Sequence, residues 1–244
     1  MLTLAHVSDI HIGGSDQSVE RAARVMRYLE TLPGPVDALI VTGDIADHGE
    51  AGEYEIARDL LRSRLPTVIC PGNHDVRATF RKVLLGEDGD GPVNQALHLD
   101  GVTIALCDSS VPGRPEGFLE DETLAWLEDV LAGGDTPAFV GFHHPPVPLG
   151  VPYVDEIRLR EPYRLEEVLA RHPRVAGLLV GHAHTAASAT FAGLPVRVAP
   201  GVISTLLLPP ETSAERPVDY DQPPAFSLHV FDGEQFVTHA RVCA

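Results

Sequence analysis

The chain has 244 residues, of which 44% are hydrophobic and 22% charged, as in a globular protein, so we expect a single domain over residues 1–244. Its formal net charge of −17 argues against a DNA or RNA surface, because such surfaces are basic, and no apolar run has the length of a membrane span. Three cysteines without motif spacing argue against a disulfide framework, and the N-terminal segment lacks a signal peptide's basic region and apolar core, so we expect a cytoplasmic protein.

The first two thirds of the chain alternate between strand-like and helix-like segments. Apolar runs of strand length occur at residues 2–7, 38–42, 67–70, 102–107, 138–142 and 178–180. Apolar residues at helical spacing predict helices over 18–32, 50–65 and 121–131, with Ser18 as the N-cap of the first. Because strands that alternate with helices are usually joined by crossovers, this pattern predicts parallel strands and an α/β fold.

After Gly181 the pattern changes to short β-like runs, which predict a more antiparallel second half. These runs are residues 187–191, 196–199, 202–208, 226–231 and 235–242. Two proline-rich stretches, 145–152 and 209–224, interrupt the order and predict loops. The second of them is a candidate arm for contact with another subunit.

Polar residues of the metal-ligand kind follow five of the predicted strands. In open α/β sheets, sites form outside the carboxyl ends of the strands, so parallel strands would bring these clusters together. The clusters are Asp9 and His11, Asp44, Asn73 with His74, His143 with His144, and His182 with His184. A lone cluster would usually be a turn, and the evidence for a site is their repetition at successive strand ends.

The spacing within two clusters also favours metal binding. In an extended segment alternate side chains point to the same side, so Asp9 and His11 would bind one ion, and His182 and His184 one or two. Carboxylate, amide and imidazole donors together suit Mn, Fe, Zn or Co better than Ca or Mg. Glycines at 43, 72 and 181 permit sharp turns beside the ligands.

The motifs D-x-H, GD, GNHD, HHPP and GHAH, in this order, resemble the calcineurin-like metallophosphoesterase superfamily over residues 2–208. The resemblance implies an α/β fold built as a four-layer αββα sandwich of mixed sheets with helices on the outer faces. DIH, GNHD and HHPP, with the run DSSVPGRPEG, look most like bacterial class III cyclic-nucleotide phosphodiesterases and their glycerophosphodiesterase relatives. Together with the 209–224 stretch, this resemblance also suggests a homodimer.

The resemblance further implies roles for individual residues. The first of two divalent metal ions would be held by Asp9, His11, Asp44 and His184. The second would be held by Asp44, Asn73, His143 and His182, with Asp44 bridging the pair. His74 would meet the substrate rather than a metal ion, and Asp47 would orient it.

Two divalent ions would keep the site positive although the protein is acidic, which explains how such a chain could bind a phosphodiester. The metal pair would lower the pKa of bound water and clamp the phosphoryl oxygens. The implied activity is hydrolysis of a small phosphodiester, with 3′,5′-cyclic nucleotides such as cyclic AMP first. The alternatives are glycerophosphodiesters and a broad phosphodiesterase or phosphomonoesterase activity.

Three other functions fit less well. A protein phosphatase would carry GD-x-x-D-R-G and GNHE, where this chain has His48 after Asp47 and Asp75 after His74. The acidic balance argues against a nuclease, so no nucleic acid polymer is expected as a partner. A non-catalytic scaffold is disfavoured because every implied ligand is present.

The remaining histidines are expected to be structural. We expect His144 to point away from the site, and we expect His6 and His48 to lie either behind the ligands or in the core. A solvated surface is expected for His98, His172, His229 and His239. Asp75 is either a support for the site or a turn cap, and Cys70 is expected to be a buried thiol.

Overall fold

The computed structural model describes residues 1–214 and 217–244. Its first large sheet contains, in spatial order, β13 (Phe236–Val242), β12 (Ala225–Phe231), β1 (Leu2–Val7), β2 (Ala38–Thr42) and β3 (Thr67–Cys70). The second contains β4 (Gln95–Leu99), β5 (Val102–Leu106), β6 (Ala138–Gly141), β7 (Val175–Val180), β9 (Leu194–Val198) and β8 (Ala187–Phe191). The short strands β10 (Thr205–Leu206) and β11 (Val218–Asp219) pair with each other.

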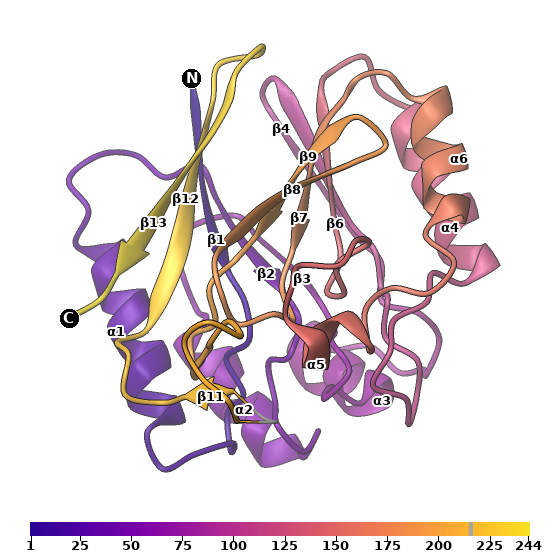
Figure 1. Cartoon of the computed structure of the whole chain (residues 1–244). Helices are drawn as coiled ribbons and strands as arrows, with labels where there is room; N and C mark the ends of the chain where they lie inside the picture. Colours follow the sequence, from indigo (N-terminus) through magenta and orange to yellow (C-terminus); the bar gives the residue numbers. More distant parts are fainter. Residues whose placement is uncertain (215–216) are drawn as a thin grey trace.

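Helices cover the outer faces of both sheets, as Figure 1 shows. The helices are α1 (Ser18–Glu30), α2 (Ala51–Leu60), α3 (Arg77–Phe80), the π-helix η1 (Arg81–Leu85), α4 (Asp121–Ala132), α5 (Pro152–Asp155) and α6 (Tyr163–Arg171). One apolar core lies between α1, α2 and the first sheet, and another between α4, α6 and the second sheet. A third core, with Ile40 and Phe139, joins the two sheets. The predicted four-layer αββα sandwich is therefore confirmed.

Both sheets are mixed, as expected. β1, β2 and β3 run parallel, as do β5, β6, β7 and β9, so their carboxyl ends lie at one edge. β12 and β13 are antiparallel to their neighbours, and so are β4 and β8. The parallel strands β2, β5 and β6 are buried along their whole length, because a neighbouring layer covers each face.

Several predicted boundaries were wrong, for identifiable reasons. Ser18 is the first residue of α1 and not its cap, because its Oγ contacts Gly13 N and Ser15 O before the helix. The first two helices end at Glu30 and Leu60. Their predicted ends, Leu32 and Leu65, directly precede Pro33 and Pro66, and helical backbone is disfavoured at a residue before proline. The predicted strand 202–208 is reduced to β10. β4 and α6 were missed, although the apolar Leu165, Val168 and Leu169 have helical spacing.

A buried histidine pair joins β1 and β12. His6 Nδ1 lies 3.1 Å from His229 Nε2, His6 Nε2 lies 2.8 Å from Thr42 Oγ1, and His229 Nδ1 lies 2.9 Å from Thr238 Oγ1. Burial lowers the pKa of His6 to about 3 and lowers that of His229 as well. The predicted solvated surface is therefore wrong for His229.

The other predicted surface histidines differ in exposure. His98 and His239 are exposed as expected, whereas His172 keeps only 13% of its side chain exposed. Within residues 1–214 and 217–244, no helix is long and apolar enough to cross a membrane. Two residues of the predicted 209–224 arm, 215 and 216, lie outside the described residues.

Candidate metal centre

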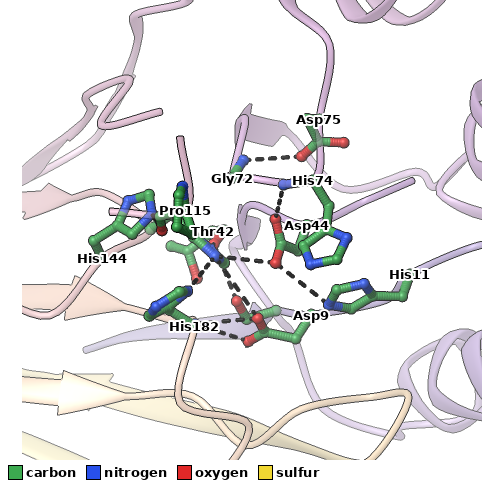
Figure 2. Close-up of polar contacts among 12 residues, drawn as sticks. Asp9, His11, Thr42, Asp44, Gly72, His74, Asp75, Pro115, His144 and His182 are labelled. Atoms are coloured by element: carbon green, nitrogen blue, oxygen red, sulfur yellow. Dashed lines mark hydrogen bonds and ion pairs between the residues drawn. The ribbon is translucent and has the colours of Figure 1, made fainter. Parts of the chain in front are cut away.

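The loops after β1, β2, β3, β6 and β7 meet at one edge of the two sheets and bring the predicted ligands together. Figure 2 shows Asp9, His11, Asp44 and His182 among them. Four groups of three side chains each place their ligand atoms within 4.8 Å of one another. These groups are Asp9–His11–His184, Asp9–Asp44–His143, His11–Asp44–His74 and His143–His144–His182. The clustering expected from parallel strands is therefore present.

The backbone at five of the seven predicted ligands is left-handed rather than extended. Asp9, His11, Asp44, His182 and His184 have φ of 55°, 46°, 49°, 67° and 51°, and they are five of the seven non-glycine residues with positive φ among those described. The expectation that extended alternation aligns Asp9 with His11 was therefore wrong, because both residues lie in turns beyond β1. Such conformations are costly and cluster at functional sites.

Hydrogen bonds between neighbouring loops hold these turns in place. The N–H groups of Asp9 and His11 donate to the carbonyls of Gly43 and Asp44, at 3.1 and 2.9 Å. Gly43 supplies a left-handed turn at φ 90°, whereas a Cβ at Gly72 would lie 2.2 Å from Asp44 Oδ1. Gly72 therefore permits a close approach of two chains rather than a left-handed turn.

Asp75 supports the loop that carries Asn73 and His74. Its carboxylate accepts hydrogen bonds from Gly72 N and Tyr54 Oη, at 2.9 and 3.0 Å, and from two further N–H groups in the loop after β2. Burial, with a smaller contribution from Asp44, raises the pKa of Asp75 to about 6. Of the two roles left open by the sequence, support for the site is the one observed.

Three imidazoles are held by their Nδ1 atoms, so that Nε2 faces the cluster. Nδ1 of His11 lies 2.8 Å from Asp47 Oδ1, and Nδ1 of His143 lies 2.7 Å from the carbonyl of Thr42. Nδ1 of His184 lies 2.8 Å from Ser204 Oγ. The sequence did not reveal Thr42, because a backbone carbonyl has no residue-type signal, or Ser204, which follows no motif.

The Nε2 atoms point at carboxylate oxygens. Asp44 Oδ2 lies 3.3 Å from His11 Nε2 and 3.2 Å from His143 Nε2, and Asp9 Oδ1 lies 3.4 Å from His184 Nε2. An imidazole that donates through Nδ1 presents a lone pair at Nε2, which a carboxylate repels unless a cation or a proton lies nearby. The arrangement therefore requires positive charge.

Without metal ions, protons on His11 and His143 would supply that charge, whereas burial lowers the pKa of His184 to about 4. Burial alone would lower the pKa of His11 and His143, but the Asp44 carboxylate outweighs it and raises them to about 10 and 9. Burial would raise the pKa of Asp44, and the two histidines hold it well below its ordinary value. Divalent cations would replace these protons, as metal binding to histidine does generally.

Unpartnered polar atoms fit the same interpretation. Within the described chain, five buried side-chain nitrogen or oxygen atoms have no hydrogen-bond partner, and three of them are Asn73 Oδ1, His182 Nε2 and His11 Nε2. Buried polar atoms are nearly always partnered, so a cluster of exceptions fits a site where these atoms bind a ligand. The donor set of carboxylate, amide and imidazole groups fits divalent metal ions.

His74 and Asp47 lie at the open side of the cluster. The His74 side chain is 41% exposed, and its Nδ1 lies 2.9 Å from the Asp47 carbonyl and 3.6 Å from Asp47 Oδ1. The Asp47 carboxylate makes its shorter contact with His11, which is the first cause of its lowered pKa. Asp47 thus contacts both a predicted ligand and the predicted substrate-facing histidine.

His144 is buried behind the site. Its Nδ1 lies 2.8 Å from Ser109 Oγ. Its Nε2 lies 3.2 Å from the carbonyl of Pro115, and Figure 2 labels both His144 and Pro115. Its ring is 4.7 Å from that of His182. Because both ring nitrogens have partners, we interpret His144 as the residue that holds the loop around Pro115 against the site.

A cleft of about 300 Å³ opens over the cluster. Its lining includes the polar side chains of Asp44, Asn73 and His74 and apolar side chains such as those of Ile157 and Leu206. No lysine or arginine belongs to the part of this lining that the structure describes. The cleft size is that of a small-molecule site.

The model of the calcineurin-like phosphoesterase family matches residues 2–186, which is more than half of the chain. The chain belongs to this family. Metal-dependent hydrolysis of phosphodiesters is the activity that membership and the names of the relatives support.

Among curated proteins, this phosphoesterase is similar to a probable cyclic nucleotide phosphodiesterase from Rhodococcus erythropolis, at 37% identity over 94% of the chain and 80% of that protein. A glycerophosphodiester phosphodiesterase from Enterobacter lignolyticus is 32% identical over 98% and 90%. The crystal structure of a dimetal phosphatase from Danio rerio has the same fold, with a TM-score of 0.71 and 17% identity over 100% of this chain and 96% of that one.

Proposed function

We propose that this phosphoesterase hydrolyses 3′,5′-cyclic nucleotides such as cyclic AMP at a dinuclear metal centre. The observation that carries the proposal is the convergence of three imidazole Nε2 atoms on Asp9 and Asp44, which fits bound divalent cations. The probable cyclic nucleotide phosphodiesterase at 37% identity supports the substrate class.

We assign the ligands as the motifs imply. Asp9, His11, Asp44 and His184 would hold one ion, and Asp44, Asn73, His143 and His182 the other. When bound, the ions would supply the positive charge that attracts the phosphodiester and would activate water for attack. The metal pair would be chosen from Mn, Fe, Zn and Co, which the mixed donor set accommodates.

His74 would transfer a proton to the leaving group. Its Nδ1–H donates to the Asp47 carbonyl, so the exposed ring presents Nε2 to the cleft, and in the imidazolium form Nε2 carries the proton that is transferred. An alkoxide leaves a phosphodiester poorly unless it is protonated, and a positioned imidazole is a suitable proton donor. Asp47 would hold both this ring and the ring of His11 in place.

Glycerophosphodiesters are the second candidate substrates, because the Enterobacter lignolyticus relative is named for them. The deciding experiment compares hydrolysis of cyclic AMP, glycerophosphocholine and bis(p-nitrophenyl) phosphate by Mn-loaded protein, with Asp44→Ala as the control. Cleavage of cyclic AMP that is lost in Asp44→Ala supports the proposal. If glycerophosphocholine is cleaved and cyclic AMP is not, glycerophosphodiesters replace cyclic nucleotides as the proposed substrates. If none of the three compounds is cleaved, the proposed phosphodiesterase activity is wrong.

We also propose that residues 1–244 form one domain, since a single core joins the two sheets. A cytoplasmic location is supported by three free, buried cysteines, because thiols persist in a reducing compartment. A homodimer through the 209–224 arm stays a prediction, which light scattering would test.

A further inference from the structure

The cleft has an aromatic mouth that the metal ligands do not explain. Tyr153 of α5 and Tyr220, just after β11, line the same cleft as Asp44 and His74, and they are 41% and 51% exposed. The apolar side chains beside them include Ile157 and Leu206. In Figure 1, α5 and β11 lie at the same end of the molecule. The cleft therefore combines a polar floor for a phosphate with an apolar, aromatic side.

A buried arginine holds the segment that carries Tyr220. Arg21 of α1 is 5% exposed, and its guanidinium donates to the carbonyls of Val202, Tyr220 and Gln222, at 2.8, 3.1 and 2.7 Å. The planar guanidinium suits such multiple, fixed hydrogen bonds better than a lysine ammonium. Arg21 thus joins the Tyr220 segment to residues that follow the His184 loop.

Residues 202–204, to which Arg21 joins the Tyr220 segment, are themselves attached to the metal centre. Ser204, two residues after Val202, contacts Nδ1 of His184, and the N–H groups of Val202 and Ile203 donate to the carbonyl of Asp9. Asp219 further orders the turn, since its carboxylate accepts from Asp221 N at 2.8 Å. The position of Tyr220 relative to the ligands is therefore set by hydrogen bonds at several points.

We propose that Tyr153 and Tyr220 bind the planar base of a cyclic nucleotide and determine specificity, and that Arg21 is the positioning residue for Tyr220. This inference rests on the proposed function, whose substrate it narrows. Any nucleobase can stack on an aromatic ring, whichever polar groups the base carries, because every base has a π-face. A glycerol group offers no such face.

Steady-state kinetics on metal-loaded protein test the proposal with two substrates, cyclic AMP and glycerophosphoglycerol, which has no ring. In Tyr153→Ala and Tyr220→Ala we expect KM for cyclic AMP to rise about tenfold, the scale of one lost stack, with kcat within about twofold. KM for glycerophosphoglycerol should not change. Tyr220→Phe should retain the wild-type KM, and Arg21→Lys should raise KM for cyclic AMP alone.

Tyr163→Ala is the matched control, because Tyr163 is 55% exposed on α6 and does not line the cleft. An equal rise of KM for both substrates, or no rise for cyclic AMP, would overturn the proposal. A rise for glycerophosphocholine as large as that for cyclic AMP would also overturn it, since a quaternary ammonium would then be the group bound.

A binding measurement separates this proposal from the proposed function. Cyclic AMP is titrated calorimetrically into metal-loaded His74→Ala protein with and without Tyr220→Ala. About tenfold weaker binding in the double variant supports the aromatic site even if wild-type protein hydrolyses no phosphodiester. Equal binding, or no binding, rejects the site whether or not turnover is observed.

Discussion

The carboxylate of Asp47 lies 2.8 Å from Nδ1 of His11 and 3.6 Å from Nδ1 of His74. One carboxylate thus contacts a predicted metal ligand more closely than the histidine that it was expected to orient. Its first effect should be on the tautomer of His11, since a hydrogen bond to one ring nitrogen determines which nitrogen binds a metal.

Asp47→Asn should therefore weaken metal binding as well as turnover. We expect an apparent metal affinity about 10- to 100-fold lower, the usual effect of losing a partner of a ligating histidine. Metal content after dialysis against graded chelator measures it. If the variant keeps wild-type affinity and loses only turnover, Asp47 acts through His74 alone.

His74→Ala should show the opposite pattern. The His74 side chain is 41% exposed and its Nδ1 contacts Asp47, so removing it leaves the ligand cluster intact. We expect both metal ions to be retained while kcat falls about 10²- to 10⁴-fold, the usual contribution of a general acid or base. Elemental analysis measures the metal content of the variant, and steady-state kinetics measure its kcat. Loss of metal in this variant would show that His74 is a ligand.

Asp108→Ala should destabilise the whole fold. Arg77 Nε lies 2.8 Å from Asp108 Oδ2, and both side chains are buried, at 7% and 0% exposure. Asp108 is the fully buried one of the two carboxylates that pair with Arg77, the other being Glu120 at 2.9 Å, and breaking such a buried pair costs about 3–5 kcal/mol. Urea unfolding measures this loss.

The control for Asp108 is Glu87→Ala. Glu87 pairs with Arg81 but is 58% exposed, so we expect a change below about 1 kcal/mol. Similar losses in the two variants would show that burial does not set the strength of the Arg77–Asp108 pair.

Acid should destabilise the protein through His6. Its folded pKa is lowered to about 3, so between pH 6.5 and 3 the unfolded chain binds a proton that the folded chain excludes. The free energy of unfolding should then fall as pH falls below 6.5, by up to about 1.4 kcal/mol per pH unit. His6→Gln should reduce this slope in urea titrations between pH 7 and 5.

His239→Gln serves as the control for His6, because His239 is exposed on β13. Its slope should match that of the wild type. An unchanged slope in His6→Gln would mean that other groups cause the acid sensitivity.

The sequence predicted the parallel strands well, because buried apolar runs such as 38–42 and 67–70 are bounded by glycine or proline. It also predicted which side chains would meet, since parallel strands end at one edge. It did not predict how they meet. The left-handed turns at Asp9 and His11 depend on carbonyls of the neighbouring GD loop, and such long-range contacts leave no local pattern.

Other errors have the same origin. His229 was expected on the surface because alternation in 226–231 did not show that both faces of β12 have neighbours. In the 202–208 run, Val202 and Ile203 donate their N–H groups to the Asp9 carbonyl, and only Thr205–Leu206 form a strand. The role of Arg21 leaves no signal in the sequence, since the guanidinium bonds to backbone carbonyls about 180 to 200 residues away.

The candidate centre lies across the seam between the two sheets. Asp9, His11, Asp44 and Asn73 follow strands of the first sheet, whereas His143, His182 and His184 follow strands of the second. The carboxylate of Asp9 accepts from the N–H of His182, 173 residues later. Neither sheet therefore carries the full ligand set alone. A complete centre can form only after the two sheets have packed against each other.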